Sequence, residues 1–342
     1  MNHRGVDTPI FSFRNTTYCT DPSIRSILDD IRHDARYRDI EIGAVCDTSM
    51  HRTHLAGIGA TICVIIWGLT FLFSKHLMVF FTPIQLMTMR CLIAFAILWV
   101  VHPRWSFDIR TEWIFILMAV FGNVVYFSTE NLALTYTYTS EVCILTSMTS
   151  MMSLALMHVL FKDSVGKVQV MGFIISLIGV VLVAFNGSVI LDLDPIGDVL
   201  ALTSALSWAI YGVMLRWFDK DFDVMVLTRK MMFYGFLMGA LLMIVEGEPF
   251  EPSHLMELDN LFSLVFLGGL GSCMCFVLWN RSVRVLGVIK SNIFIYAMPV
   301  VTLIAGHIVF DEIITVMAVV GMVLVISGML MANGRSKDEA GS

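Results

Sequence analysis

Long apolar stretches separated by short polar breaks run through residues 55–332. One helix that spans a membrane needs about 20 apolar residues. The pattern predicts ten such spans, at about residues 55–74, 84–101, 113–135, 140–161, 168–186, 197–217, 226–245, 261–280, 289–309 and 315–332. The breaks contain residues typical of turns, among them Pro83, Asp194-Pro195 and Glu248-Pro249. We therefore expect an all-α membrane protein.

Basic residues alternate with the predicted spans. If the N-terminus is cytoplasmic, the cytoplasmic connections hold groups of basic residues such as Arg104 and Arg110. The opposite connections hold Lys75 as their single Lys or Arg, together with many acidic residues. Cytoplasmic loops keep an excess of Lys and Arg. This distribution predicts a multi-pass protein with both termini in the cytoplasm, and we expect the plasma (inner) membrane.

Composition supports a membrane protein. Hydrophobic residues make up 57% of the chain and charged residues 15%, whereas a soluble domain averages roughly 25% charged residues. The chain has neither a GxxxxGK[ST] sequence for ATP nor an HExxH helix for zinc. We expect no metal, no other cofactor, no catalytic residues and no nucleic-acid partner, so a membrane enzyme is disfavoured.

Two polar tails flank the apolar region. In residues 1–54 arginines and aspartates alternate, which predicts a largely disordered cytosolic tail. A short amphipathic helix that begins at Asp21-Pro22 is the alternative. Residues 333–342 form a second cytosolic tail.

An internal repeat relates the two halves at a constant offset of 149 residues. The matched positions are His158, Phe161, Asp163, Gly172 and Gly179 in the first half and His307, Phe310, Glu312, Gly321 and Gly328 in the second. Because each half has five spans, an odd number, the second half must enter the membrane from the opposite side. Such inverted repeats are typical of secondary transporters. Chance similarity between apolar helices is the alternative, and the matched turn residues favour the repeat.

Three stretches resemble the EamA-type transporters of the drug/metabolite transporter superfamily. They are WGLTFLFSK followed by Pro83 and Arg90, SWAIYGVMLR, and MPVVTLIAGHIVFDE followed by Gly321 and Gly328. The resemblance covers residues 55–332. It implies ten transmembrane helices as an inverted five-plus-five repeat, residues 55–187 and 188–332, around a central cavity. It also implies export or exchange of small metabolites such as amino acids, amines or drug-like compounds.

The fourth span departs from that family, which usually has a proline where this chain has Ser150. We expect the fourth helix to kink less, or to kink through Ser and Thr side chains that bond back to carbonyl oxygens.

Two carboxylates, Glu130 and Glu141, fall within apolar spans. An ionised carboxylate in hydrocarbon is unfavourable, so each must face a watery cavity, meet a cation or be protonated. We expect both near the outer mouth, as a site for a cationic group or a coupling proton, with interfacial carboxylates as the alternative. Lys290 follows Glu141 by the repeat offset of 149 residues, so the two halves carry opposite charges at corresponding positions. Such a pair could bind the two charged groups of a zwitterion, or form a gate pair on opposite sides of the membrane. The alternative is that Lys290 simply reaches water.

Other polar and aromatic residues in the spans are further candidates for substrate binding. For Arg90 we expect one of two roles. It either forms a salt bridge between helices, with Glu130 or Glu141 as its partner, or it contacts the substrate. The remaining candidates, each with helix packing as its alternative, are Trp67, Asn131, Trp208, Tyr211, Asn280, Asn292 and Tyr296.

These features predict a secondary active transporter that works by alternating access around a central cavity. A membrane sensor or scaffold that works through the N-terminal tail is the alternative. The expected partners are a small-molecule substrate and the lipid bilayer. Proton or ion coupling and a homodimer stay open.

Overall fold

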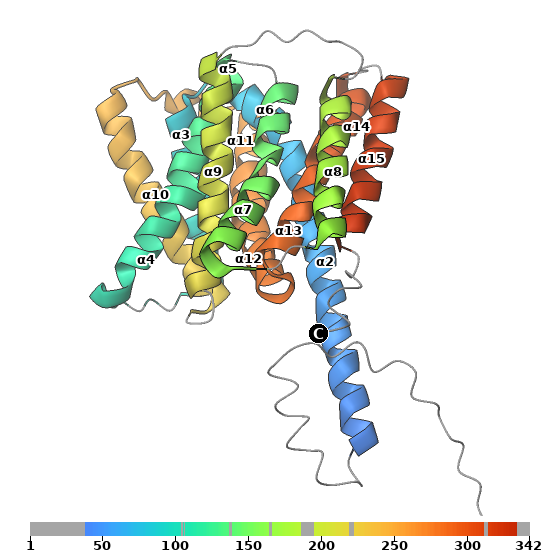
Figure 1. The fold of residues 1–342 in the computed structure, drawn as a ribbon. Helices are drawn as coiled ribbons and strands as arrows, with labels where there is room; N and C mark the ends of the chain where they lie inside the picture. The colour runs from blue at the N-terminus through green and yellow to red at the C-terminus, as the bar shows by residue number, and fades with distance from the viewer. Residues whose placement is uncertain are drawn as a thin grey trace, which may run out of the picture. The chain divides into compact units, whose positions relative to one another are not determined.

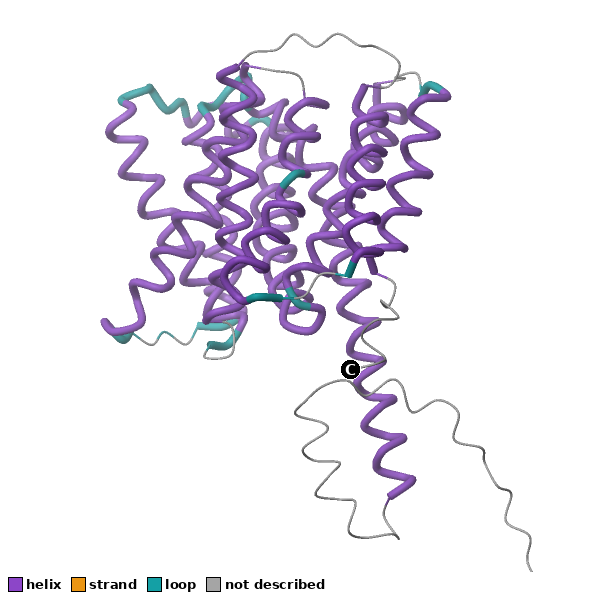
Figure 2. The backbone as a smooth tube through the Cα atoms, viewed as in Figure 1, coloured by secondary structure: helices purple, strands orange, loops and turns teal. Residues whose placement is uncertain are grey.

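The computed structural model describes residues 38–103, 105, 107–136, 139–163, 166–185, 195–218, 222–310 and 314–333. These residues form helices joined by turns and loops, with no strand among them (Figure 2). The chain divides into two compact units, Leu55–Ser336 and Met1–His54 with Lys337–Ser342. The candidate site lies in the unit Leu55–Ser336.

The helices follow the chain in the order labelled in Figure 1. They are α2 (Arg38–Leu77), α3 (Pro83–Val101), α4 (Ile109–Ala119), η2 (Val120–Val125), α5 (Tyr126–Tyr136), α6 (Thr139–Ser147), α7 (Thr149–Phe161), α8 (Lys167–Phe185), α9 (Pro195–Phe218), α10 (Val224–Glu246), η4 (Pro252–Met256), α11 (Leu258–Val265), η5 (Phe266–Met274), α12 (Cys275–Leu286), α13 (Val288–Ile293), η6 (Phe294–Ala297), α14 (Met298–Phe310) and α15 (Val316–Asn333).

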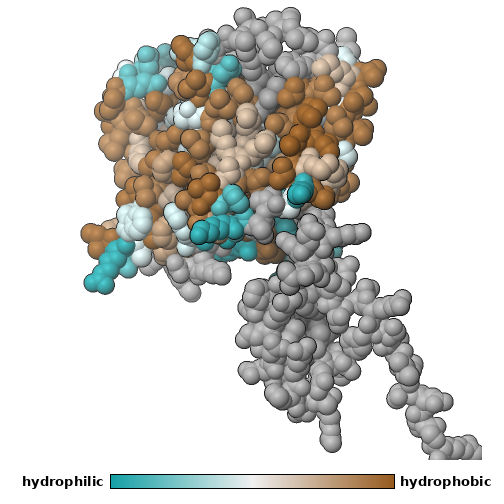
Figure 3. Space-filling model, in the orientation of Figure 1, coloured by the Kyte–Doolittle hydropathy of each residue, from teal (hydrophilic) through white to brown (hydrophobic). Residues whose placement is uncertain are grey.

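Seven helical stretches in the described residues are long and apolar enough to cross a membrane. They are His51–Leu77, Pro83–Val101, Ile109–Tyr136, Pro195–Phe218, Val224–Glu246, Leu258–Leu286 and Val288–Ala305. Three shorter apolar helices, Leu145–Phe161, Lys167–Val183 and Val316–Ala332, accompany them. Each predicted span falls on one of these ten stretches, and the count of ten crossings stays a prediction. On the face drawn in Figure 3, hydrophobic side chains cover the middle band and hydrophilic ones gather toward its two ends.

Two predicted boundaries differ from the structure. Helix α2 begins at Arg38, so helical backbone extends back into the predicted tail, while residues 1–37, with the expected helix start at Asp21, lie outside the described residues. Helix α12 continues to Leu286, so Arg281 and Arg284 belong to a helix instead of a connection. Arginine is a good helix former, and a charge therefore does not end a helix. Gly287 alone separates α12 from α13, at a φ of 81° that favours glycine.

Polar residues begin two helices of the bundle, α3 and α10. The Thr82 hydroxyl accepts from the Gln85 backbone N–H at 3.2 Å, and the Gln85 side chain accepts from the Thr82 N–H at 3.1 Å. With Pro83 in the first turn, this capping box orients α3. Asp223 begins α10 in a similar way, because its carboxylate accepts from the Met225 N–H at 2.8 Å.

Two π-helical segments widen the helices beside the site. They are η2, between α4 and α5, and η5, between α11 and α12. Residues 269–274 of η5 correspond to η2 at the offset of 149 residues. Such segments in α-helices are rare and frequent at functional sites. Here they give the two corresponding helices of the halves the same irregularity.

The fourth predicted span breaks at Met148, between α6 and α7. Before the break, the Thr146 hydroxyl donates to the Val142 carbonyl at 2.8 Å and the Ser147 hydroxyl donates to the Cys143 carbonyl at 2.7 Å. A kink through such Ser and Thr bonds to carbonyl oxygens is one of the two possibilities that the sequence offered. Bonds of this kind bend helices.

Helices α8 and α15 pack with their backbones in close approach, side by side in Figure 1. The contact uses the four glycines of the internal repeat, Gly172, Gly179, Gly321 and Gly328. Between them the Ser176 hydroxyl donates to the Val325 carbonyl at 3.3 Å, and these two residues are also 149 positions apart. Small residues permit this approach between membrane helices.

Candidate functional site

A small cavity lies among α2, α3, α5, α9, α12 and α14. It is lined by Trp67, Thr70, Phe71, Arg90, Tyr126, Phe127, Glu130, Trp208, Phe276 and Met298. Most of these side chains are aromatic, and two of them are charged. In the described conformation it has room for about one water molecule. A molecule larger than water can therefore enter only after the helices move apart.

Arg90 brings a positive charge into this cavity from α3. Its side chain is 1% exposed, and Nε donates to the Ser272 hydroxyl of η5 at 3.2 Å. The guanidinium carbon lies 4.1 Å from the centre of the Phe127 ring, which is the geometry of a cation–π contact. Nη1 has no hydrogen-bond partner among the described residues. Arg90 is thus held in place with one donor group unused.

Glu130 brings a carboxylate to the same cavity from α5. It is 5% exposed, and its side chain interacts with that of Tyr126, one turn earlier on the helix. Oε2 has no hydrogen-bond partner in the described part of the chain. Arg90 and Glu130 form no direct ion pair there, although they are close enough for their charges to interact. The depth predicted for Glu130, near the outer mouth, stays a prediction, and the structure encloses the residue among aromatic rings.

Two tryptophans form the aromatic wall. The rings of Trp67 and Trp208 meet edge to face, with centroids 5.3 Å apart and planes at 88°. Tyr126 packs against Trp208 at 4.9 Å. The Trp67 indole donates to the Gly271 carbonyl of η5 at 2.9 Å, which ties α2 to this π-helical segment. Edge-to-face packing of this kind stabilises a closed cluster.

Tyr211 and Asn280 lie together behind this wall. The Tyr211 hydroxyl donates to Asn280 Oδ1 at 2.7 Å, and Asn280 Nδ2 donates to the Thr228 hydroxyl at 3.1 Å. Tyr211 contacts Trp208 at 5.4 Å between ring centroids. Gly122 of η2 makes room for the Tyr211 ring, because a Cβ at that position would lie 2.9 Å from it. This hydrogen-bonded set supports Trp208 from outside the cavity.

Asn292 and Tyr296 lie at a different contact, between α7 and α13 with η6. Asn292 Nδ2 donates to the Ser153 hydroxyl at 2.6 Å, and the Ser150 hydroxyl donates to the Asn292 carbonyl at 2.6 Å. Tyr296 is buried against Phe173. These residues join helices instead of lining the cavity, as the helix-packing alternative expects.

The other three predicted residues are scattered. Asn131 is buried next to Glu130, and neither polar atom of its amide has a partner among the described residues. Lys290 is exposed on α13. The Glu141 side chain lies outside the described residues, so the pairing of Glu141 with Lys290 stays a prediction.

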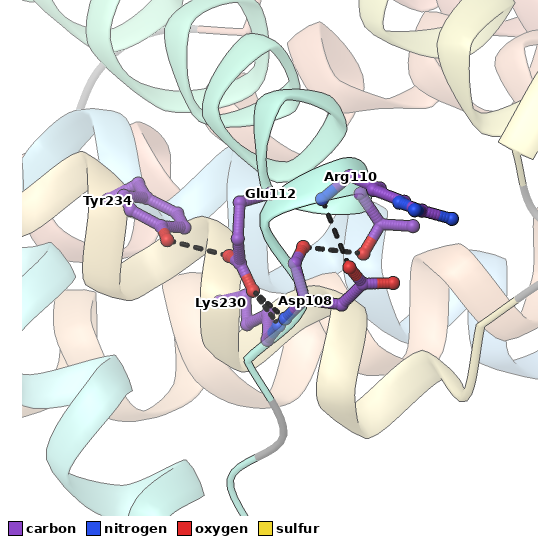
Figure 4. A network of polar contacts seen from close by, with 6 residues as sticks. Asp108, Arg110, Glu112, Lys230 and Tyr234 are labelled. Carbon is purple, nitrogen blue, oxygen red and sulfur yellow. Dashed lines mark hydrogen bonds and ion pairs between the residues drawn. The ribbon is translucent and has the colours of Figure 1, made fainter.

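A second buried carboxylate, which the sequence did not single out, is Glu112 on α4. Figure 4 shows Glu112 between Lys230 and Tyr234 of α10. Oε1 forms an ion pair with Lys230, and Oε2 accepts from the Tyr234 hydroxyl at 2.6 Å. The side chains of Lys230 and Glu112 are 3% and 6% exposed. Unlike Glu130, Glu112 has both oxygens paired, so it holds two helices together.

The sequence also missed several residues of the cavity wall, namely Thr70, Phe71, Tyr126, Phe127, Phe276 and Met298. A helical spacing signal existed for three of them, because Thr70 and Phe71 follow Trp67 by three and four residues, and Tyr126 precedes Glu130 by four. Phe127, Phe276 and Met298 resemble any other apolar residue in a span, and nothing in the local sequence distinguishes them.

A bundle of several helices that are long and apolar enough to cross a membrane defines a multi-pass integral membrane protein. Two matches to the model of the EamA-like transporter family cover residues 54–185 and 195–334. The chain belongs to this family. The two matches coincide closely with the predicted halves, 55–187 and 188–332, and so suggest the repeat.

The chain is also similar to several uncharacterized transporters. The uncharacterized transporter YyaM of Bacillus subtilis is 29% identical over 223 residues, 64% of this chain and 71% of that protein. An uncharacterized transporter of Archaeoglobus fulgidus is 26% identical over 273 residues, 78% of this chain and 94% of that protein. A protein of known crystal structure has a TM-score of 0.64 at 18% identity, over 82% of this chain and 96% of that chain. This last similarity concerns the fold.

Proposed function

We propose that this protein is a secondary active transporter that exports or exchanges small metabolites such as amino acids, amines or drug-like compounds. It has no enzymatic role in this proposal. The observation that carries it is the pair Arg90 and Glu130, each buried in the cavity with a polar atom unused. Buried polar groups in proteins are nearly always hydrogen-bonded, so unused ones point to a partner that comes and goes.

The contrast with Glu112 supports this interpretation. Both carboxylates are buried on neighbouring stretches of one helical run, Ile109–Tyr136. Glu112 has a lysine and a tyrosine for its two oxygens. Glu130 lacks such a set, although it lies among equally apolar neighbours. A carboxylate that served only to pair helices would resemble Glu112.

Transport requires that the cavity open alternately to the two sides of the membrane. In our proposal, ten transmembrane helices form an inverted five-plus-five repeat, and the two halves rock around the cavity. The reciprocal packing of Gly172, Gly179, Gly321 and Gly328 supports a two-fold relation between the halves. The closed aromatic wall around Trp67 and Trp208 then corresponds to an occluded state.

The orientation follows from the charged residues. We place both termini in the cytoplasm and the protein in the plasma (inner) membrane, because Lys and Arg accumulate in alternate connections. Arg110, in the first turn of α4, and Arg216, at the end of α9, then lie on the cytoplasmic side. Glu248 and Glu251, after α10, lie on the opposite side.

Ligand screening followed by transport tests this function. The purified full chain is heated with amino acids, nucleosides, amines and dyes, and a ligand that binds the folded state raises Tm. Each hit is then measured by counterflow into proteoliposomes. We expect hits that cross the membrane in the wild type and lose both effects in Arg90→Gln. Glu248→Gln, a change at an exposed carboxylate, serves as the control. The proposal is wrong if every hit crosses no faster than in empty liposomes.

A further inference from the structure

The cavity contains one charge that cannot be removed. The Arg90 guanidinium keeps its proton at every pH that a cell experiences. It is held by Ser272 and by the Phe127 ring, while Nη1 at the cavity wall has no partner among the described residues. A buried cation with an unused donor is suited to an anionic group, since charge-assisted hydrogen bonds are strong in such surroundings.

Glu130 is the acidic residue of the cavity lining. The titratable and charged groups that face it are Arg90 of α3, Tyr126 of α5 and Cys143 of α6. Among these three groups, Arg90 alone carries a permanent charge. The protonation state of Glu130 therefore sets the net charge of the cavity as zero or plus one.

Charge balance limits what such a cavity can hold, because a net charge is costly at low dielectric. With Glu130 ionised, the empty cavity is neutral. A zwitterion leaves it neutral, with its carboxylate at Arg90 and its ammonium at Glu130. An organic anion makes it negative unless Glu130 also takes up a proton. An amine without a carboxylate leaves an uncompensated positive charge.

We propose that this cavity is a binding site for organic carboxylates with an apolar body, and that such an anion binds to Arg90 together with one proton on Glu130. The carboxylate accepts hydrogen bonds from Arg90, and the proton comes from solvent and forms the O–H bond of the Glu130 carboxylic acid. The rings of Trp67, Trp208 and Phe276 contact the apolar body. The proposal deepens the transport function and rests on it for the opening of the cavity.

Three probes that share a phenyl ring and differ in charge test this inference. They are phenylacetate, L-phenylalanine and phenethylamine, each titrated calorimetrically into the purified full chain from acid to mildly alkaline pH. Where Glu130 is ionised in the empty protein, the affinity for phenylacetate should fall about tenfold per unit rise in pH, because one proton binds with each anion. Comparison of two buffers with different ionisation enthalpies should show uptake of about one proton. In the same pH range, binding of L-phenylalanine should be independent of pH, and phenethylamine should not bind.

Variants connect the proton to Glu130. Glutamine is neutral like a protonated glutamate, so Glu130→Gln should bind phenylacetate with no proton uptake and at all pH values alike. Glu130→Asp keeps the acid and should keep the pH dependence. Arg90→Gln should abolish phenylacetate binding, both as a single variant and combined with Glu130→Gln. Glu248→Gln removes an exposed carboxylate and should match the wild type.

Each remaining outcome is decisive. The proposal is overturned if phenylacetate binding to the wild type is independent of pH, if phenethylamine binds equally well, or if phenylacetate binds neither the wild type nor Glu130→Gln. Failure of the transport function is distinguishable from these results. If phenylacetate binds with a proton but the protein carries nothing across liposomes, the proposed binding site stands and the proposed transport function is wrong. If the protein transports but binds phenylacetate independently of pH, the transport function stands and the proposed proton-linked site is wrong.

Discussion

The carbonyl oxygen of Gly179 occupies the place where Gly321 would carry a side chain, and the carbonyl of Gly321 does the same to Gly179. A Cβ built on either residue would lie 2.7 Å from the carbonyl oxygen of the other. The relationship is reciprocal because α8 and α15 meet at positions 142 residues apart that both have partners at the repeat offset, Gly328 for Gly179 and Gly172 for Gly321. Glycine at these positions is therefore a requirement of helix packing.

Substitution of either glycine by leucine should separate these helices. We expect Gly179→Leu and Gly321→Leu to destabilise the protein by about 1–3 kcal/mol or more, the usual range for overpacking. Thermal unfolding in detergent measures the effect. Gly57→Ala is the matched control, since a Cβ there would meet only Phe294 at 4.0 Å. Equal Tm values for the leucine variants and the control would contradict the packing argument.

Removal of Lys230 should expose how strongly α4 depends on α10. Lys230→Met leaves the Glu112 carboxylate buried without its cation, which typically costs about 3–5 kcal/mol. The double variant Lys230→Met with Glu112→Gln should recover much of that loss, because the uncompensated charge is gone. Thermal unfolding checks both. Lys290→Met, at an exposed lysine, should change Tm little. A drop in Tm as large as that of Lys230→Met would contradict the conclusion that the buried pair of Glu112 and Lys230 holds α4 and α10 together.

The indole N–H of Trp67 should contribute to stability apart from its ring. Trp67→Phe keeps an aromatic ring beside Trp208 and removes the hydrogen bond to Gly271. The buried Gly271 carbonyl then loses a donor, at a cost of about 0.5–1.5 kcal/mol. Denaturant or thermal unfolding measures this change. An unchanged stability would mean that another donor replaces the indole.

Opposite labelling of two engineered cysteines tests the proposed orientation. In a chain with Cys19 and Cys46 replaced by serine, Arg110→Cys should react with a membrane-impermeant maleimide only from the cytoplasmic side. Glu248→Cys should react only from the other side. Both positions are exposed in the structure. Labelling of both from one side would invalidate the alternate placement of the helices.

Deletion of residues 1–37 separates the transporter from the alternative of a sensor or scaffold. The deletion stops before Arg38, where α2 begins, so the helix itself is kept. We expect the shortened chain to bind the same ligands and to carry them at a similar rate. Counterflow and thermal shift are the two measurements. Loss of binding with a normal fold would favour a working role for the tail.

Agreement between sequence and structure is best where a residue acts through its own helix. Pro83 begins α3, and the hydroxyls of Thr146 and Ser147 bond to carbonyl oxygens four positions earlier, so local rules describe them. Agreement is weaker at helix ends such as the one near Arg281 and Arg284, where the apolar pattern stops six residues before the helix does. Hydropathy measures where lipid ends, and backbone hydrogen bonding continues beyond that point.

Of the predicted site residues, the structure brings Trp67, Arg90, Glu130 and Trp208 to one cavity. Tyr211 and Asn280 lie behind its wall, while Asn292 and Tyr296 join other helices. The sequence marked all of these as unusual because each is polar or aromatic within an apolar span. It contained no distances between spans, so it could not separate residues of the cavity from residues that only pair helices.

The sequence by itself determined that this is a membrane protein, where its apolar helices lie, and that the glycine pattern occurs twice. Each of these depends on composition and on spacing along one chain. Only the tertiary structure decided which buried charges have partners. Glu112 and Glu130 lie 18 residues apart with similar neighbours, yet α10 supplies Lys230 and Tyr234 to the first, and the second faces a cavity. The partner of a buried charge lies on another helix, and the packing of the helices across the bundle decides which side chains lie next to that charge.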